Sequence, residues 1–121
     1  MKPATSSVYA VTSTPFEAEV LRSPVPVLVD FTATWCGPCK ALAKVMHRLA
    51  EETEGRVRIV TLDIDDAPDV ATRFGVRSVP TVVAFDRGDK TAQHVGLTTR
   101  EKLLAMLPAH VAPAIGRPIA S

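Results

Sequence analysis

The two cysteines of this chain, Cys36 and Cys39, lie three positions apart within the segment Trp-Cys-Gly-Pro-Cys at residues 35–39. Two thiols at this spacing could supply half of a zinc site, form a structural disulfide, or cycle between dithiol and disulfide. Zinc needs about four ligands, and His47 would lie about 12 Å further along the same predicted helix. We therefore expect no metal site, and a redox-active pair is the favoured interpretation.

Cys36 occupies a position that should make its thiol reactive. The pattern places it at the start of a helix, where unpaired N–H groups and the helix dipole favour an anion, so the pKa of this thiol should fall. Cys39 would lie one turn further on, with about 5 to 6 Å between the two Cα atoms, which suits a disulfide. Between them, Gly37 lets another backbone approach closely and Pro38 fixes φ for helix entry.

Asp30 is an acid within an otherwise apolar, β-branched run at residues 25–31. A carboxyl buried in such a strand should have a raised pKa, and this strand leads toward the cysteines. If Cys39 is buried, its deprotonation requires a base, and Asp30 is the candidate. The alternative is an acid at a strand end whose side chain simply reaches solvent.

The surrounding sequence predicts alternating strands and helices. Apolar or alternating runs predict strands at residues 8–11, 25–31, 56–64, 81–85 and 90–95. Helical periodicity or start signals predict helices that open near Thr14, Cys39, Pro68 and Thr98, and capping boxes pair Thr14 with Glu17 and Thr98 with Glu101. Long strand–helix–strand crossovers require parallel pairing, and the short turn at Gly88 requires an antiparallel hairpin. The sequence therefore predicts an α/β fold with a mixed sheet.

Length and composition limit the function classes. A chain of 121 residues suits one domain, which we expect over residues 1–107, followed by a poorly ordered, proline-rich tail over residues 108–121. With 14 Lys and Arg against 13 Asp and Glu, no surplus of positive charge is available to bind nucleic acid. No apolar run reaches the length of a signal peptide or a membrane span, so we expect a cytoplasmic protein that does not act at a membrane. That compartment disfavours a structural disulfide.

Several short motifs together resemble the thioredoxin family from about residue 8 to residue 107. They are VDF at residues 29–31, WCGPCK at 35–40, DID at 63–65, VPT at 79–81, and the glycines Gly88 and Gly96. A bare pair of cysteines would not be specific, whereas WCGPCK with VPT downstream is. The resemblance implies a thioredoxin fold, with a central mixed sheet of four to five strands flanked by four helices.

The resemblance also implies a protein-disulfide reductase that acts by thiol–disulfide exchange. Cys36 would be the exposed nucleophile, Cys39 the buried resolving thiol, and Asp30 the group that accepts and returns a proton. The peptide bond before Pro80 would be cis and would face the disulfide. A target peptide would lie in a groove formed by Trp35, Gly37, Pro38, Val79, Pro80 and Gly96. The alternatives are a core aromatic for Trp35 and an ordinary strand end for Gly96.

Partners follow from the same resemblance. No bound cofactor is implied apart from the redox-active disulfide, and electrons would come from an NADPH-dependent flavoprotein, thioredoxin reductase. They would pass to disulfide-containing protein substrates through a monomeric carrier. The basic stripe Lys40, Lys44 and Arg48 could steer an acidic partner, or it could simply be a solvated helix face. Two other functions stay open, namely a disulfide oxidant or isomerase and a redox-independent binding module in a larger assembly.

Three residues depart from the family pattern near the predicted site. Thr32 stands where a tryptophan is frequent, which should change the local packing. Lys44 stands where a proline often kinks the long helix. Thr61 stands where a lysine is frequent near the buried acid, so Asp30 is expected to lack its usual charge partner.

Overall fold

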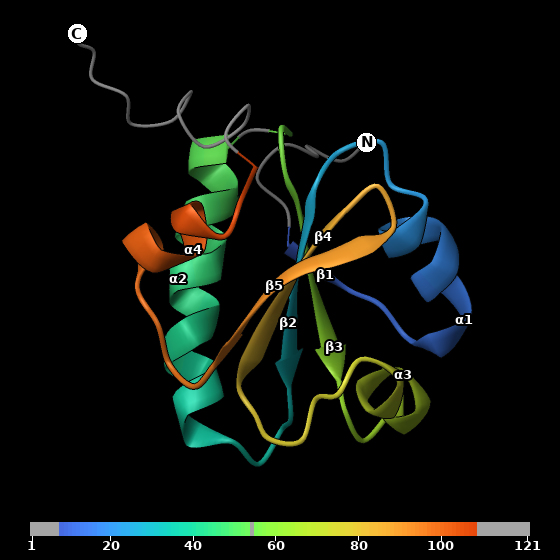
Figure 1. Ribbon diagram of the computed structural model, residues 1–121. Helices are drawn as coiled ribbons and strands as arrows, with labels where there is room; N and C mark the ends of the chain where they lie inside the picture. The colour runs from blue at the N-terminus through green and yellow to red at the C-terminus, as the bar shows by residue number, and fades with distance from the viewer. Residues whose placement is uncertain (1–7, 54, 109–121) are drawn as a thin grey trace, which may run out of the picture.

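A mixed β-sheet forms the centre of the protein. The computed structural model describes residues 8–53 and 55–108, so the predicted tail lies, apart from Pro108, outside the described residues. Within the described residues, five strands form one sheet in the spatial order β1–β3–β2–β4–β5 (Figure 1). The predicted mixed sheet is confirmed, and it has five strands rather than four.

The two kinds of strand pairing divide the sheet. β3 (Arg58–Asp63) pairs in parallel with both β1 (Val8–Ala10) and β2 (Val27–Thr32). β4 (Thr81–Asp86) runs antiparallel to β2 and forms a hairpin with β5 (Asp89–Val95). β2 is therefore a central strand, with the parallel part of the sheet on one side and the hairpin on the other.

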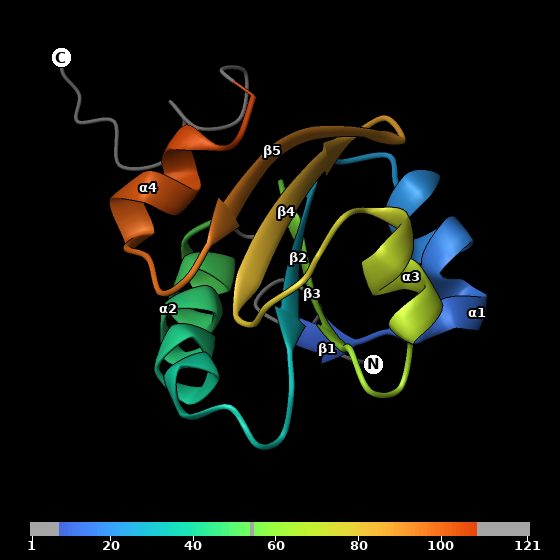
Figure 2. The same cartoon turned by 60° about the horizontal axis from the view of Figure 1, so that its bottom comes forward.

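Helices cover both faces of the sheet (Figures 1 and 2). One face carries the long helix α2 (Gly37–Thr53) together with α4 (Arg100–Ala105). The other face carries α1 (Ser13–Phe16), its π-helical continuation η2 (Glu17–Leu21), and α3 (Pro68–Arg73). Among the described residues, the order of strands and helices along the chain agrees with the sequence-based prediction.

The central strand β2 is buried on both faces, which explains its almost continuous apolar sequence. Val27, Val29 and Phe31 join the cluster beneath α1 and α3. Leu28, which points the other way, joins the cluster beneath α2 and α4. Because side chains alternate along a strand, Asp30 also faces α2 and α4.

Both predicted capping boxes are wrong. α1 already begins one residue before Thr14, and no side chain caps its start. The cap of α4 is Thr99 rather than Thr98, and its hydroxyl accepts a hydrogen bond from the backbone N–H of Lys102 at 3.2 Å. The Thr98 side chain is buried instead, and its hydroxyl has no hydrogen-bond partner among the described residues.

Candidate redox site

The two cysteines lie where the chain passes from β2 into α2. Gly37 is the first residue of α2 and directly follows Cys36. Cys36 and Cys39 form a disulfide with 5.4 Å between their Cα atoms, which confirms the predicted one-turn spacing. The backbone N–H of Cys39 donates a hydrogen bond to Cys36 Sγ at 3.2 Å. An N–H directed at a sulfur where a helix begins will stabilise that sulfur as a thiolate once the disulfide opens.

The disulfide is almost covered by apolar neighbours. Cys36 is 5% exposed and Cys39 is 3% exposed. Ala33, Ile64 and Val79 pack with them, and these three residues come from three different loops. The resemblance implies an exposed Cys36, and in the disulfide form this is not observed, because the loops after β3 and before β4 close over the pair. The residues around this cluster therefore control access to the sulfurs.

Trp35 stands beside the pair and faces solvent. Its side chain is 68% exposed, so the alternative of a core aromatic is wrong. The indole N–H donates a hydrogen bond to Oδ2 of Asp65 at 2.9 Å. Asp65 belongs to the DID motif, but it lies 30 residues further along the chain and no local signal pairs it with Trp35. This hydrogen bond fixes the indole at the rim of the site.

The segment before β4 forms another side of the site. The peptide bond between Val79 and Pro80 is cis, as the resemblance implies. The N–H of Gly96 donates to the carbonyl oxygen of Pro80 at 2.8 Å. Gly96 has a φ of +96°, a conformation that favours glycine. Gly37 and Pro38 are exposed at the start of α2, between the two cysteines.

Asp30 is a buried acid, so the alternative of a solvated strand end is wrong. It is 1% exposed, and burial raises the pKa of its carboxyl to about 7. Its Oδ1 atom has no hydrogen-bond partner among the described residues. The neighbouring residues in register are Thr61 on β3 and Val82 on β4. As expected from Thr61, no cation within the described part of the chain contributes to the pKa shift, whose single cause is desolvation.

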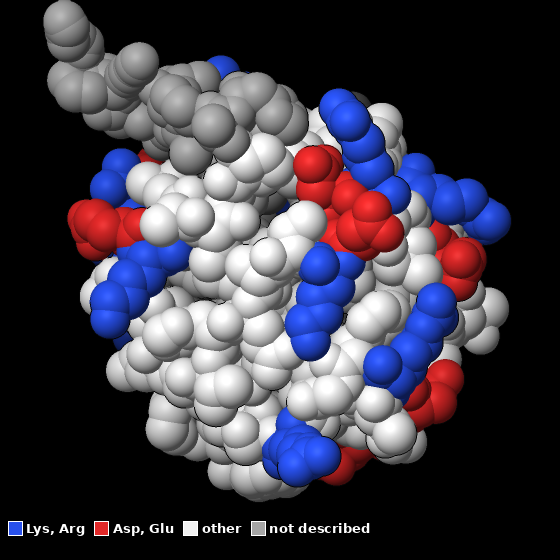
Figure 3. Space-filling model, in the orientation of Figure 1, with Lys and Arg blue, Asp and Glu red and all other residues white. Residues whose placement is uncertain are grey.

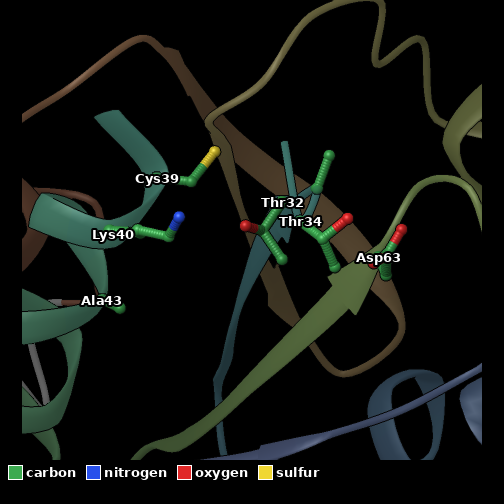
Figure 4. A pocket seen from close by; sticks show the side chains of 7 residues that line it. Thr32, Thr34, Cys39, Lys40, Ala43 and Asp63 are labelled. Carbon is green, nitrogen blue, oxygen red and sulfur yellow. The ribbon is translucent and has the colours of Figure 1, made fainter. Parts of the chain in front are cut away.

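A pocket of about 210 Å³ opens between the start of α2 and the ends of β2 and β3 (Figure 4). Cys39 and Thr32 contribute to its wall, and the side chains of Thr32 and Lys40 point toward each other across it. Its lining residues are Thr32, Ala33, Thr34, Cys39, Lys40, Ala43 and Asp63. The sequence identified Thr32 as a site of altered packing but did not predict an open pocket beside Cys39.

The face of the molecule shown in Figure 3 carries no single charge sign. Lysines and arginines are interspersed with aspartates and glutamates on the face in Figure 3. The exposed side chains Lys40, Lys44 and Arg48 lie on α2, and their proposed role in steering an acidic partner stays a prediction.

Across residues 8–53 and 55–108, no group of three or more His, Cys, Asp or Glu residues could hold a metal ion. None of the helices in that same part of the chain has the length and apolar character needed to cross a membrane.

Comparison with known proteins gives a consistent result. The thioredoxin family model matches residues 7–109. Thioredoxin 1 of Nostoc sp. is 42% identical over 106 residues, which cover 88% of this chain and 99% of that protein. Thioredoxin C-2 of Corynebacterium nephridii is 39% identical over 106 residues, which cover 88% and 98% respectively. The structure of a mutant thioredoxin from Halobacterium salinarum matches with a TM-score of 0.79 at 28% identity, over 99% of this chain and 100% of that one. The dithiol spacing, the sheet order and these matches agree, and the chain belongs to the thioredoxin family.

Proposed function

We propose that this chain reduces protein disulfides with Cys36 as the attacking thiol and Cys39 as the resolving thiol. Its family and its Cys36–Cys39 pair make it a thiol–disulfide oxidoreductase, which needs no cofactor beyond the redox disulfide. The Cys36 thiolate attacks a target disulfide and forms a mixed disulfide, and Cys39 then attacks the Cys36 sulfur. The target leaves as a dithiol, and its two electrons come from the pair, which becomes a disulfide.

One observation carries the assignment of roles. The N–H of Cys39 is directed at Cys36 Sγ, at the start of α2. This hydrogen bond and the helix dipole favour negative charge on Cys36, and the thiolate is the nucleophilic form of cysteine. Cys39 is buried and lies one turn away, where it can attack the mixed disulfide without large backbone movement.

Asp30 is proposed to take the proton of Cys39 during the second step. A buried thiol resists ionisation, so the resolving attack needs a base close by. Asp30 lies on the face of β2 that packs against α2, the helix that carries Cys39. Because burial raises the pKa of Asp30 to about 7, this carboxyl can both accept and release a proton near neutral pH.

The target is proposed to bind as an extended peptide along the rim of the site. Exposed Trp35 and the pair Gly37 and Pro38 would form one side of the groove, and Val79, Pro80 and Gly96 the other. The peptide would pair with the backbone of Val79 in the manner of an added strand. Main-chain pairing accepts many side chains, so a broad range of protein substrates follows.

The same proposal includes the partners and the compartment. Thioredoxin reductase, an NADPH-dependent flavoprotein, would supply the electrons, and family membership supports this donor. The chain would act as a monomer. It would work in the cytoplasm, because a carrier that is repeatedly reduced requires a reducing compartment. The thioredoxin names of the relatives support the reducing role over an oxidant, an isomerase or a binding module.

Reduction of insulin tests the proposal. With dithiothreitol or a thioredoxin reductase as donor, the wild-type chain should accelerate insulin reduction and the resulting precipitation. Cys36→Ser should reduce the rate to that of the donor alone, because no mixed disulfide forms. A Cys36→Ser variant that kept the wild-type rate would refute the assigned role of Cys36.

A further inference from the structure

The proposed cycle leaves a proton on a buried carboxyl. When Cys39 attacks the Cys36 sulfur, the thiol proton passes to Asp30 and the product disulfide holds none. Asp30 must then release this proton to solvent before it can act as a base again. However, Asp30 is 1% exposed, and its Oδ1 atom has no hydrogen-bond partner within residues 8–53 and 55–108. A route between this carboxyl and water is therefore required.

Asp30 does not itself line the pocket beside Cys39, but Thr32, on the same strand, does. Thr32 lies two residues beyond Asp30 on the same strand, so both side chains point to the same face, about 6.6 Å apart along the strand. Thr32 is half-buried, and its side chain forms part of the pocket wall. A pocket of about 210 Å³ has room for several water molecules, since one needs about 30 Å³ in the liquid.

Alanines form part of the pocket wall, and a few polar groups capable of proton transfer also reach it. Cys39 and Lys40 reach it from α2, and Asp63 reaches it from the end of β3 (Figure 4). On the other sides of Asp30, β3 and β4 contribute Thr61 and Val82. Two threonines line the pocket, and Thr32 is the one that lies on β2, with its side chain on the same face of the strand as Asp30. A hydroxyl can accept one proton and donate another, as a relay requires.

We propose that the hydroxyl of Thr32 relays protons between Asp30 and water in the pocket bounded by Cys39, Lys40 and Asp63. This inference rests on the proposed function, in which Asp30 exchanges a proton with Cys39. After the resolving attack, Asp30 gives its proton to the Thr32 oxygen through one water, and the hydroxyl gives its own proton to pocket water. The released target thiolates take up protons from solvent, so charge and protons balance. Thr32 is thus a positioning residue that acts through Asp30.

The first test measures proton exchange without any catalytic turnover. In the oxidised protein near pH 7, where Asp30 is half protonated, relaxation of its carboxyl ¹³C signal reports the exchange rate. Thr32→Val keeps the shape but removes the hydroxyl, and it should slow exchange by about tenfold or more. Thr32→Ser should restore the rate to within about twofold, because the relay needs only the hydroxyl.

A matched control is available in the same pocket. Thr34→Val also removes a hydroxyl from the lining, but residue 34 follows the end of β2 and is exposed. It should leave the exchange rate unchanged. Equal exchange rates in wild type and Thr32→Val, or an equal loss in Thr34→Val, would overturn the relay.

Steady-state insulin reduction gives the second readout. Thr32→Val should lower kcat with little change in KM and should increase the solvent isotope effect, whereas a purely structural change would not alter that isotope effect. The two proposals can fail separately. Normal insulin reduction with unaltered exchange in Thr32→Val would overturn the relay alone. Slowed exchange in Thr32→Val, in a chain that does not reduce insulin, would support the relay and overturn the proposed function.

Discussion

Replacing Asp30 by asparagine should stabilise the folded protein at neutral pH and above. Asp30 is 1% exposed, and among the described residues its Oδ1 atom lacks a hydrogen-bond partner and no cation compensates its charge. Ionisation of such a carboxyl works against the folded state, because the unfolded chain solvates the charge freely. Asparagine has nearly the same size and shape but carries no charge at any pH.

The expected gain follows from the pKa of Asp30. Burial raises it from 3.8 to about 7, so between these values the folded protein keeps a proton that the unfolded chain has released. The bound proton therefore adds to the free energy of unfolding of the wild type. This contribution is fully present below pH 3.8 and is lost as the pH rises through 7. Each pH unit in the interval is worth about 1.4 kcal/mol, so the total is about 4 kcal/mol. The Asp30→Asn variant avoids this loss.

Urea unfolding of the oxidised proteins between pH 4 and pH 9, followed by circular dichroism, measures the effect. The unfolding free energy of Asp30→Asn minus that of wild type should rise steadily from pH 4 to pH 7 and then level off. Asp89→Asn, which removes an exposed carboxylate at the start of β5, should show no such rise. A difference that stayed constant across this pH range would refute the claim that Asp30 is held protonated by burial.

Two further predictions concern the rim of the site. Reduction of the disulfide should brighten the fluorescence of Trp35, the single tryptophan, because the adjacent disulfide quenches indole emission; unchanged emission would mean that the indole does not sense the pair. Gly96→Ala should lower stability by about 1 to 2 kcal/mol in urea unfolding, because φ at this residue is +96°. Gly37→Ala is the matched control, because Gly37 lies at a helix start with free space around it, and it should not destabilise the protein. An equal loss of stability in both variants would contradict the argument from the positive φ of Gly96.

Local signals in the sequence were sufficient to predict most of the fold and the geometry of the cysteine pair. The apolar run around Asp30 predicts a strand covered on both faces, and β2 is that strand. Once Cys36 and Cys39 are placed at a helix start, helix geometry predicts a Cα–Cα distance that a disulfide can bridge. The raised pKa of Asp30 also follows from its apolar neighbours in the chain.

Features that depend on contacts between distant segments could not be predicted in this way. The hydrogen bond from Trp35 to Asp65 joins two loops 30 residues apart. The covering of Cys36 by Ile64 and Val79 likewise depends on how the loops pack. At the start of α4, the predicted cap Thr98 is buried, so tertiary packing overrides a local preference. The open pocket depends on the gap between two elements, which no single residue specifies.

Trapping of the mixed disulfide tests the central claim most directly. Reduced Cys39→Ser should attack a protein disulfide and remain attached to it, because the resolving thiol is absent. Mass spectrometry under non-reducing conditions should then show the sum of the two masses, with the new bond at Cys36. Cys36→Ser should show no adduct under the same conditions. An adduct formed by Cys36→Ser but not by Cys39→Ser would contradict the account, because Cys39 would then be the attacking thiol.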